Sequence, residues 1–71
     1  MKTTLTNRET EILILILEEI STIEIANKLN LSKRTVDTHR SNIMRKTESS
    51  NLIGLCKYAI NNKILVLENI H

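Results

Sequence analysis

The sequence contains no proline, phenylalanine or tryptophan, and it has a single glycine, Gly54. Because Gly-Pro turn signals are missing, β-hairpins have little support and helices joined by short turns are favoured. The single cysteine, Cys56, excludes an internal disulfide, and with two widely spaced histidines it forms no common zinc-site pattern. We therefore expect no metal and no cofactor. A 71-residue domain must then depend on packed aliphatic side chains, and 41% of the chain is hydrophobic.

Signals for membranes, export and catalysis are missing as well. No stretch reaches the roughly 18 consecutive apolar residues of a membrane span, and no signal peptide precedes the charged segment after Asn7. A lone cysteine fits a reducing compartment. There is no nucleophile with a base at helical spacing and no phosphate-binding loop, so we do not expect an enzyme. These absences predict a single cytoplasmic domain over residues 1–71 with no membrane partner.

The net charge of +2 is small, but the charges are unevenly distributed. Residues 1–27 carry two basic and five acidic side chains, residues 28–46 carry six basic and one acidic, and residues 47–71 carry two of each. Positive charge concentrated on one segment is what a polyanion-binding surface requires, although a solvated helix face has the same composition.

Capping patterns predict the first two helices. The Thr-x-x-Glu and Ser-x-x-Glu patterns that begin at Thr6 and Ser21 match the capping box, in which the two side chains accept from each other's backbone N–H groups. They predict helices over residues 7–18 and 22–29. Asn30 follows the second helix, and asparagine tolerates the left-handed conformation that ends helices.

Two further helices complete the expected fold. Ser32 caps a helix over 33–46, and Asn51 caps a helix over 52–61. Only about three residues separate the second and third helices, which is the length of a helix-turn-helix corner. The sequence thus predicts an all-α four-helix bundle that contains a helix-turn-helix. Residues 63–71 form an apolar tail of undetermined form.

The third predicted helix sorts its side chains by face. Val36 and Ile43 point inward and anchor the helix, whereas Asp37, Thr38 and Ser41 point outward. An outer face of short polar and long basic side chains suits the major groove of DNA.

Apolar positions on the first and fourth helices leave a choice. Ile14 and Leu17 either form an exposed pair that contacts a regulatory domain or a second protomer, or Leu17 fills the core and only Ile14 is exposed. The candidate buried positions of the fourth helix are Leu52, Leu55, Cys56 and Ala59.

Several ordered groups of residues resemble the helix-turn-helix domain of the LuxR family. They are Leu5-Thr6-x-Arg8-Glu9-x-Glu11-Ile12-Leu13, Glu24-Ile25-Ala26-x-x-Leu29, Leu31-Ser32-x-x-Thr35-Val36-x-Thr38-His39, and Ile43-Met44-Arg45-Lys46 followed by Leu55-x-x-Tyr58-Ala59. Together they cover about residues 4–62. The resemblance implies a four-helix DNA-binding domain of the kind found at the C-terminus of bacterial response regulators and quorum-sensing regulators, and sometimes alone.

The outer face and the resemblance point to the same base-contacting residues, which are Asp37, Thr38 and Ser41. Asp37 can accept from a cytosine amino group, and the Thr38 methyl can meet a thymine methyl. Many relatives have lysine at position 37, so a different base preference is expected here. Alternatively, Asp37 only forms an ion pair with Arg34 or Arg40.

A second set of residues is expected to hold the DNA backbone without reading its sequence. These phosphate contacts are Thr22, Lys33, Arg34, Thr35, His39, Arg40, Arg45 and Lys46. His39 has no second ligand near it for a metal site, so it packs or contacts phosphate. Arg8 and Glu11 are expected to form a structural ion pair.

The resemblance also implies a homodimer formed through the fourth helix. The candidate interface residues are Leu52, Leu55, Lys57, Tyr58 and Asn62. We expect sequence-specific regulation of transcription from an inverted repeat of double-stranded DNA. In a longer parent, such as a two-component response regulator, an N-terminal receiver or ligand-binding domain would control the domain. The alternative is a small helical protein-interaction module with an incidental basic face.

Two turns depart from the family pattern. Relatives usually end the first helix at glycine, where this chain has Glu19, so the turn must close without a residue that prefers positive φ. After the third helix, relatives often have Leu-Gly-Val, where this chain has Thr47-Glu48-Ser49. Neither departure touches the outer face of the third helix.

Overall fold

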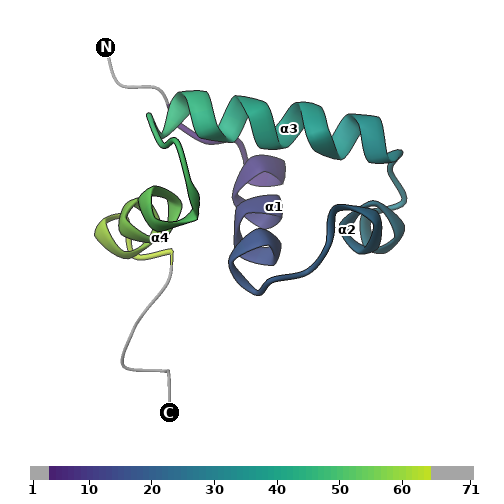
Figure 1. Cartoon of the computed structure of the whole chain (residues 1–71), viewed down its shortest axis with the longest axis horizontal. Helices are drawn as coiled ribbons and strands as arrows, with labels where there is room; N and C mark the ends of the chain where they lie inside the picture. The colour runs from purple at the N-terminus through teal and green to yellow at the C-terminus, as the bar shows by residue number, and fades with distance from the viewer. Residues whose placement is uncertain (1–3, 65–71) are drawn as a thin grey trace.

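The computed structural model describes residues 4–64, which form four α-helices (Figure 1). The helices are α1 (Asn7–Leu17), α2 (Thr22–Leu29), α3 (Lys33–Lys46) and α4 (Leu52–Asn61). The expected all-α fold is confirmed, and the predicted helix limits agree except that α1 ends one residue earlier. The predicted tail over 63–71 lies outside the described residues from position 65 onward.

Each helix begins at a side chain that accepts a hydrogen bond from the backbone N–H three residues ahead. The capping residues are Thr6, Ser21, Ser32 and Asn51. The first capping box is complete, because the Thr6 backbone N–H also donates to the Glu9 carboxylate at 2.9 Å. The second box is only half formed, which corrects the prediction. The exposed Glu24 carboxylate accepts from the Ser21 hydroxyl at 3.2 Å instead of from its backbone N–H.

One or two positions beyond the end of each helix lies a residue in the left-handed conformation, and none of these residues is glycine. They are Glu19 (φ 62°), Asn30 (φ 58°), Glu48 (φ 55°) and Lys63 (φ 59°). The N–H that follows each one donates to the carbonyl five residues earlier; for example, Ile20 donates to Leu15 at 3.2 Å. This is the Schellman motif, which normally uses glycine because an L-residue is strained there. Only Asn30 is a residue type that adopts this conformation readily.

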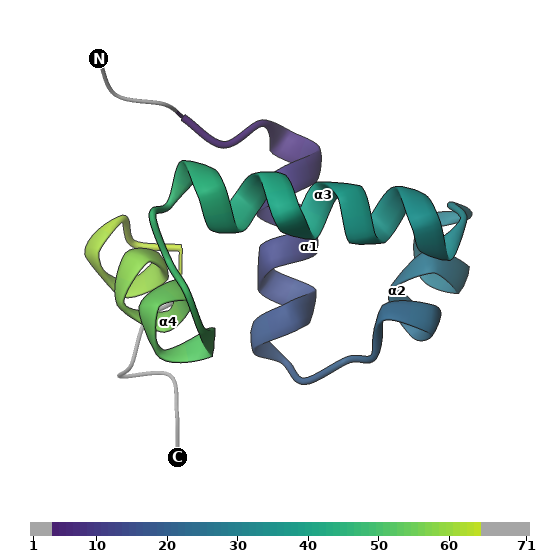
Figure 2. The ribbon, with the colours of Figure 1, turned by 45° about the horizontal axis from the view of Figure 1, so that its top comes forward.

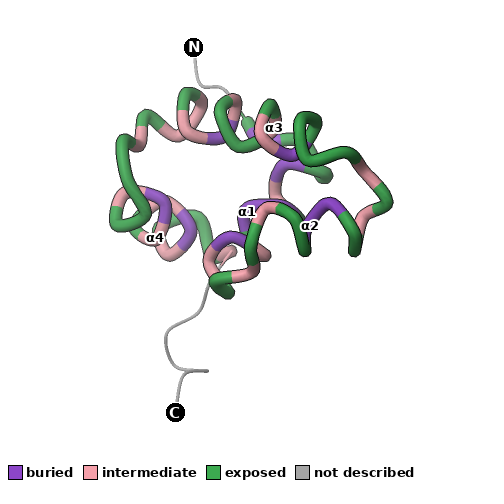
Figure 3. Tube along the Cα trace, turned by 45° about the vertical axis from the view of Figure 1, so that its right-hand side comes forward, coloured by how far each residue is buried: buried purple, intermediate pink, exposed green. Residues whose placement is uncertain are grey.

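The helix α3 crosses the other three helices (Figures 1 and 2). The shorter α2 lies beneath its N-terminal end, α4 beneath its C-terminal end, and α1 between them, in contact with all three. Figure 3 shows the buried positions of α3 turned toward the other helices and its outer side exposed. The most deeply buried side chains are Ile12, Leu13, Ile25, Val36, Ile43 and Leu55. No helix among the described residues has the length and apolarity needed to cross a membrane.

The structure decides between the alternatives for the surplus apolar residues. Leu17 is half-buried against the core and Ile14 is exposed, which agrees with the second alternative above. On α4, Leu55 is buried as predicted, but the prediction for Leu52 is wrong, because 47% of this residue is exposed. Cys56 is half-buried instead of buried. Because α4 is short, it packs through one narrow stripe, and residues in its first turn lie at the rim of the core.

Candidate nucleic-acid interface

The corner between α2 and α3 is a helix-turn-helix. Asn30, with φ 58° and ψ 44°, turns the chain out of α2, and the backbone N–H of Leu31 closes the turn on Ala26 at 2.8 Å. The Leu31 side chain packs against the core, and Ser32 caps α3. A short helix followed by a tight corner and a longer helix with one free face is the arrangement that carries a recognition helix.

The outer face of α3 is fixed by its buried anchors. Val36 is 1% exposed and Ile43 is fully buried, so the opposite side of the helix faces solvent. The exposed residues on that side, spaced so that they form one line along the helix, are Arg34, Thr38, Ser41 and Arg45. The Thr38 hydroxyl donates to the Arg34 carbonyl at 3.0 Å, which leaves its methyl and an oxygen lone pair available to a ligand.

Asp37 flanks this line and is already engaged. Its carboxylate accepts from the Lys33 ammonium at 2.9 Å, one helical turn away, and 61% of the Lys33 side chain and 49% of the Asp37 side chain are exposed. The expectation that Asp37 would pair with Arg34 or Arg40 is therefore wrong. A lysine four residues before an aspartate reaches it directly along the helix surface.

Lys46 is bound to Glu9, which corrects its expected phosphate contact. The two side chains form a hydrogen-bonded ion pair of 2.8 Å, with 17% of the Lys46 side chain and 5% of the Glu9 side chain exposed. Burial raises the pKa of Glu9, but hydrogen bonds from Lys46 and Thr6 and the lysine charge outweigh burial and lower the pKa below its ordinary value. This pair ties the end of α3 to the start of α1.

The remaining positive charge of α3 belongs to three arginines. The ion pairs within residues 4–64 are Arg8–Glu11, Lys33–Asp37 and Lys46–Glu9, of which the first was expected. Arg34, Arg40 and Arg45 have no carboxylate partner in this part of the chain. Arg45 donates to the neutral Asn42 amide oxygen at 3.0 Å, which keeps its charge available.

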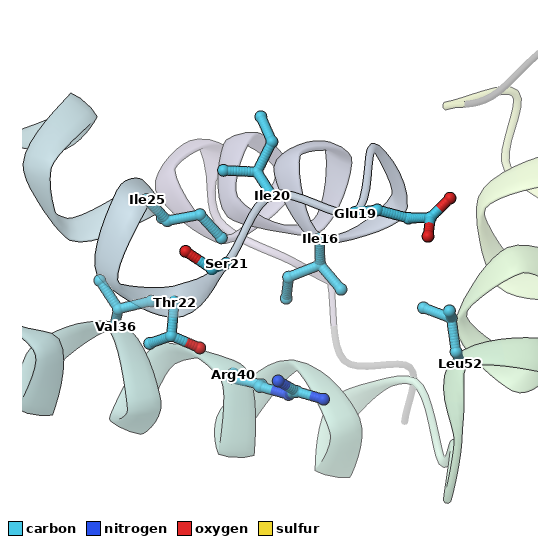
Figure 4. Close-up of a pocket in the computed structure, with 9 residues that line it drawn as sticks. All are labelled: Ile16, Glu19, Ile20, Ser21, Thr22, Ile25, Val36, Arg40 and Leu52. Atoms are coloured by element: carbon cyan, nitrogen blue, oxygen red, sulfur yellow. The ribbon is translucent and has the colours of Figure 1, made fainter.

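Two of the expected phosphate contacts meet at a groove of about 400 Å³ beside α3. Figure 4 shows Arg40 extending from α3 toward the wall formed by Leu52, with Thr22 nearby at the start of α2. Thr35 is exposed near the start of α3, where its hydroxyl accepts from Ser32 at 2.9 Å.

His39 is half-buried, and its Nδ1 atom is buried without a hydrogen-bond partner in the described structure. No cluster of three or more metal-ligating side chains occurs among residues 4–64.

The surface of α4 differs from the expected dimer interface. Leu55 is 1% exposed, so its side chain cannot meet a second protomer and that assignment is wrong. Tyr58 is half-buried and packs against the core. The remaining candidates, all exposed, are Leu52, Lys57 and Asn62. Sequence reasoning missed Ile53, which is 68% exposed, although helical periodicity gives the signal, since burying Leu55 turns Ile53 outward.

A polar line on the second helix of a helix-turn-helix, with arginines that have no carboxylate partner among residues 4–64, is typical of a DNA-binding domain. The model of a protein family described as "Bacterial regulatory proteins, luxR family" matches residues 3–59. The chain therefore belongs to the LuxR family, and its class is that of DNA-binding regulators of transcription. The family and the relatives below are regulatory proteins, which argues against an enzyme.

Similar proteins carry names of the same kind. The chain is 54% identical over 56 residues to "Uncharacterized response regulatory protein YgeK" of Escherichia coli, covering 79% of this chain and 38% of that protein. It is 41% identical over 64 residues to "Probable transcriptional regulator ycf29" of Pyropia yezoensis, covering 90% and 29%. It is 41% identical over 61 residues to "Oxygen regulatory protein NreC" of Staphylococcus carnosus, covering 86% and 28%. The chain thus spans well under half the length of these relatives, and no solved structure matches it significantly.

Proposed function

We propose that this chain binds double-stranded DNA sequence-specifically, with α3 in the major groove. Asp37, Thr38 and Ser41 contact base edges, and the arginines of α3 hold phosphates on either side. The observation that carries this proposal is the exposed line on α3 that begins at Arg34 and ends at Arg45. These two residues are about 16 Å apart along the helix axis, at 1.5 Å per residue, which lets the arginines bracket the residues between them.

The proposed backbone contacts include residues beside this line. Arg40 and Thr22 line the same groove, so a phosphate of a DNA backbone that follows α3 meets both side chains. Lys33 lies on the same edge of the helix as Arg40, and Thr35 and His39 lie on the other edge, but two of these three residues already have partners and the imidazole is half-buried. We therefore assign most of the phosphate binding to the arginines.

We further propose that two copies pair through α4 on an inverted repeat. The support is an exposed apolar surface in the first turn of α4, where Leu52 is 47% and Ile53 is 68% exposed. Lys57 lies on the same helix, Asn62 is its C-terminal cap, and both supply a polar rim. A twofold contact of this kind sets the spacing of the two recognition helices, and hence of the two half-sites.

The relatives suggest a place for the domain in a longer regulator. Proteins named as response regulatory and oxygen regulatory proteins match this chain over about a third of their length. We propose that this domain is the effector part of a two-component response regulator and that a receiver domain controls its pairing.

The test for DNA binding is selection of bound duplexes from a random pool, followed by fluorescence anisotropy at increasing salt. We expect a recurring motif and a steep salt dependence, with Arg34→Ala and Arg45→Ala each lowering the slope of log K against log[salt] by about 0.9. The matched control is Lys28→Ala, because Lys28 is exposed beside residues of α1, away from the line on α3. An equal effect of the control, or salt-insensitive binding, would contradict the proposal and favour a protein-interaction module.

The test for pairing uses Cys56. This residue lies near the middle of α4, where a twofold axis brings each residue close to its own copy. We expect a bifunctional maleimide to link two chains, more so with inverted-repeat DNA, and we expect Ile53→Asp to abolish the link while retaining the fold. Undiminished cross-linking of this variant would contradict pairing through the Ile53 surface.

A further inference from the structure

We propose that Lys33 and Asp37 read one G·C base pair as a unit, a role that deepens the proposed function and rests on it. The ion pair they form is at the flank of the line on α3, within the first half of the helix. Residues near the N-terminus of a recognition helix are those that contact base edges.

The geometry of the pair matches the edge of a base pair. The Lys33 Nζ and Asp37 Oδ2 atoms are 2.9 Å apart, and about half or more of each side chain is exposed. In the major groove, guanine O6 accepts and cytosine N4 donates. These two atoms are joined by a Watson–Crick hydrogen bond, so they too lie about 2.9 Å apart. A donor and acceptor at this separation can lie directly over an acceptor and donor, with Lys33 donating to O6 and Asp37 accepting from N4.

The neighbouring groups on the bases select the G·C pair. Guanine N7 lies beside O6 and offers the ammonium a second acceptor. An A·T pair also presents one donor and one acceptor, adenine N6 and thymine O4. There, however, the carboxylate of Asp37 would lie beside the adenine N7 lone pair, and Lys33 would lie beside the thymine methyl. A C·G pair, in which the two bases exchange strands, would place the Lys33 ammonium over the cytosine amino donor and the Asp37 carboxylate over the guanine O6 acceptor.

The structure also explains why the two residues act together. An isolated carboxylate on a DNA-binding face is repelled by the phosphates, whereas Asp37 carries its counter-charge with it in Lys33. Removal of either partner therefore changes both the local charge and the pattern of donors and acceptors. A surface ion pair of this kind contributes little to the stability of the fold, so its removal isolates the effect on recognition.

The experiment repeats the random-pool selection with the wild-type chain, Lys33→Met and Asp37→Asn. We expect the wild-type motif to contain one G·C position that both variants lose, with about tenfold weaker discrimination at that position, since one good base contact is worth about 1–3 kcal/mol. Arg8→Met is the matched control, because Arg8 forms a similar exposed ion pair with Glu11 at 3.2 Å on α1. Circular dichroism checks that every variant keeps its helices.

Modified bases then identify the atoms. Inosine in place of guanine leaves the major-groove edge intact and should leave affinity unchanged, whereas 7-deazaguanine removes N7 and should weaken binding by the wild type but not by Lys33→Met.

If both variants keep the wild-type motif, Lys33 and Asp37 do not recognise a G·C pair, and the proposed function still stands. A change in only one variant would overturn the joint action. Failure of the wild type to enrich any motif would overturn the proposed function and this inference together.

Discussion

Replacing Glu19 by glycine should stabilise the domain. Glu19 ends α1 with φ 62°, and its backbone N–H donates to Ile16 at 2.9 Å, so it occupies the position where Schellman motifs favour glycine. Its side chain is exposed and has no ion-pair partner within residues 4–64. Glu19→Gly therefore removes backbone strain and sacrifices little side-chain contact.

The magnitude follows from two opposing terms. An L-residue in the left-handed conformation costs about 1–2 kcal/mol, which Glu19→Gly removes. Glycine is also more flexible in the unfolded chain, and this flexibility destabilises the fold by about 0.4–1 kcal/mol. We expect a net stabilisation of about 0.5–1 kcal/mol, which raises the melting temperature of a domain this small by about 2–8 °C.

The assay is thermal and urea unfolding followed by circular dichroism. The matched control is Glu18→Gly, since Glu18 is the adjacent acidic residue and has an ordinary φ of −84°. This control removes the same charge and relieves no strain, so it should destabilise the domain by about 0.5–1 kcal/mol. If both variants lowered the melting temperature equally, the strain argument would be refuted.

Four further predictions concern the core and the buried ion pair. Lys46→Met should destabilise the domain by about 3 kcal/mol in urea unfolding, because it leaves the Glu9 carboxylate buried without a partner; a loss below 1 kcal/mol would show that the pair is solvated. Folding lowers the pKa of Glu9, so the ionised carboxylate stabilises the fold at pH values above its unfolded pKa of about 4.3. This stabilisation is lost as the pH falls through the lower folded pKa. Glu9→Gln should therefore flatten the pH dependence of stability in that range, and an unchanged slope would contradict the assignment. Leu55→Ala should cost about 2–5 kcal/mol and Leu52→Ala far less, because one is buried and the other is at the rim; similar losses would contradict the packing of α4. Val36→Asp should abolish helicity, because it buries an unpaired carboxylate between α3 and the core, and retained helical dichroism would contradict this packing.

The helices and the recognition face were predictable because they follow from local rules. A cap such as Thr6 acts on a backbone N–H only three residues away, so the chain pattern contains both partners. The same applies to the faces of α3, since 3.6 residues per turn place Val36 and Ile43 together and Thr38 opposite them. The short corner at Asn30 then follows from the distance between two capped segments.

The partners of charged and rim residues were not predictable in the same way. Lys46 looked like a phosphate ligand because it continues the basic run of α3, but folding brings it 2.8 Å from Glu9, 37 positions earlier in the chain. Leu55 and Ile53 are both aliphatic and differ only in which side of α4 meets α1. The turn at Glu19 shows a related limit, because the chain leaves α1 through a left-handed glutamate, a conformation that local preference disfavours.

By itself, the order of residues determined that this chain is four capped helices with a basic third helix and that it resembles a LuxR-type regulator. These properties depend on hydrogen bonds and side-chain spacing within single helical turns. Only the tertiary structure decided which cations remain available to DNA and which apolar side chains remain exposed on α4. Both depend on contacts between segments distant in the chain, where burial sets the energy of a charge or a methyl group.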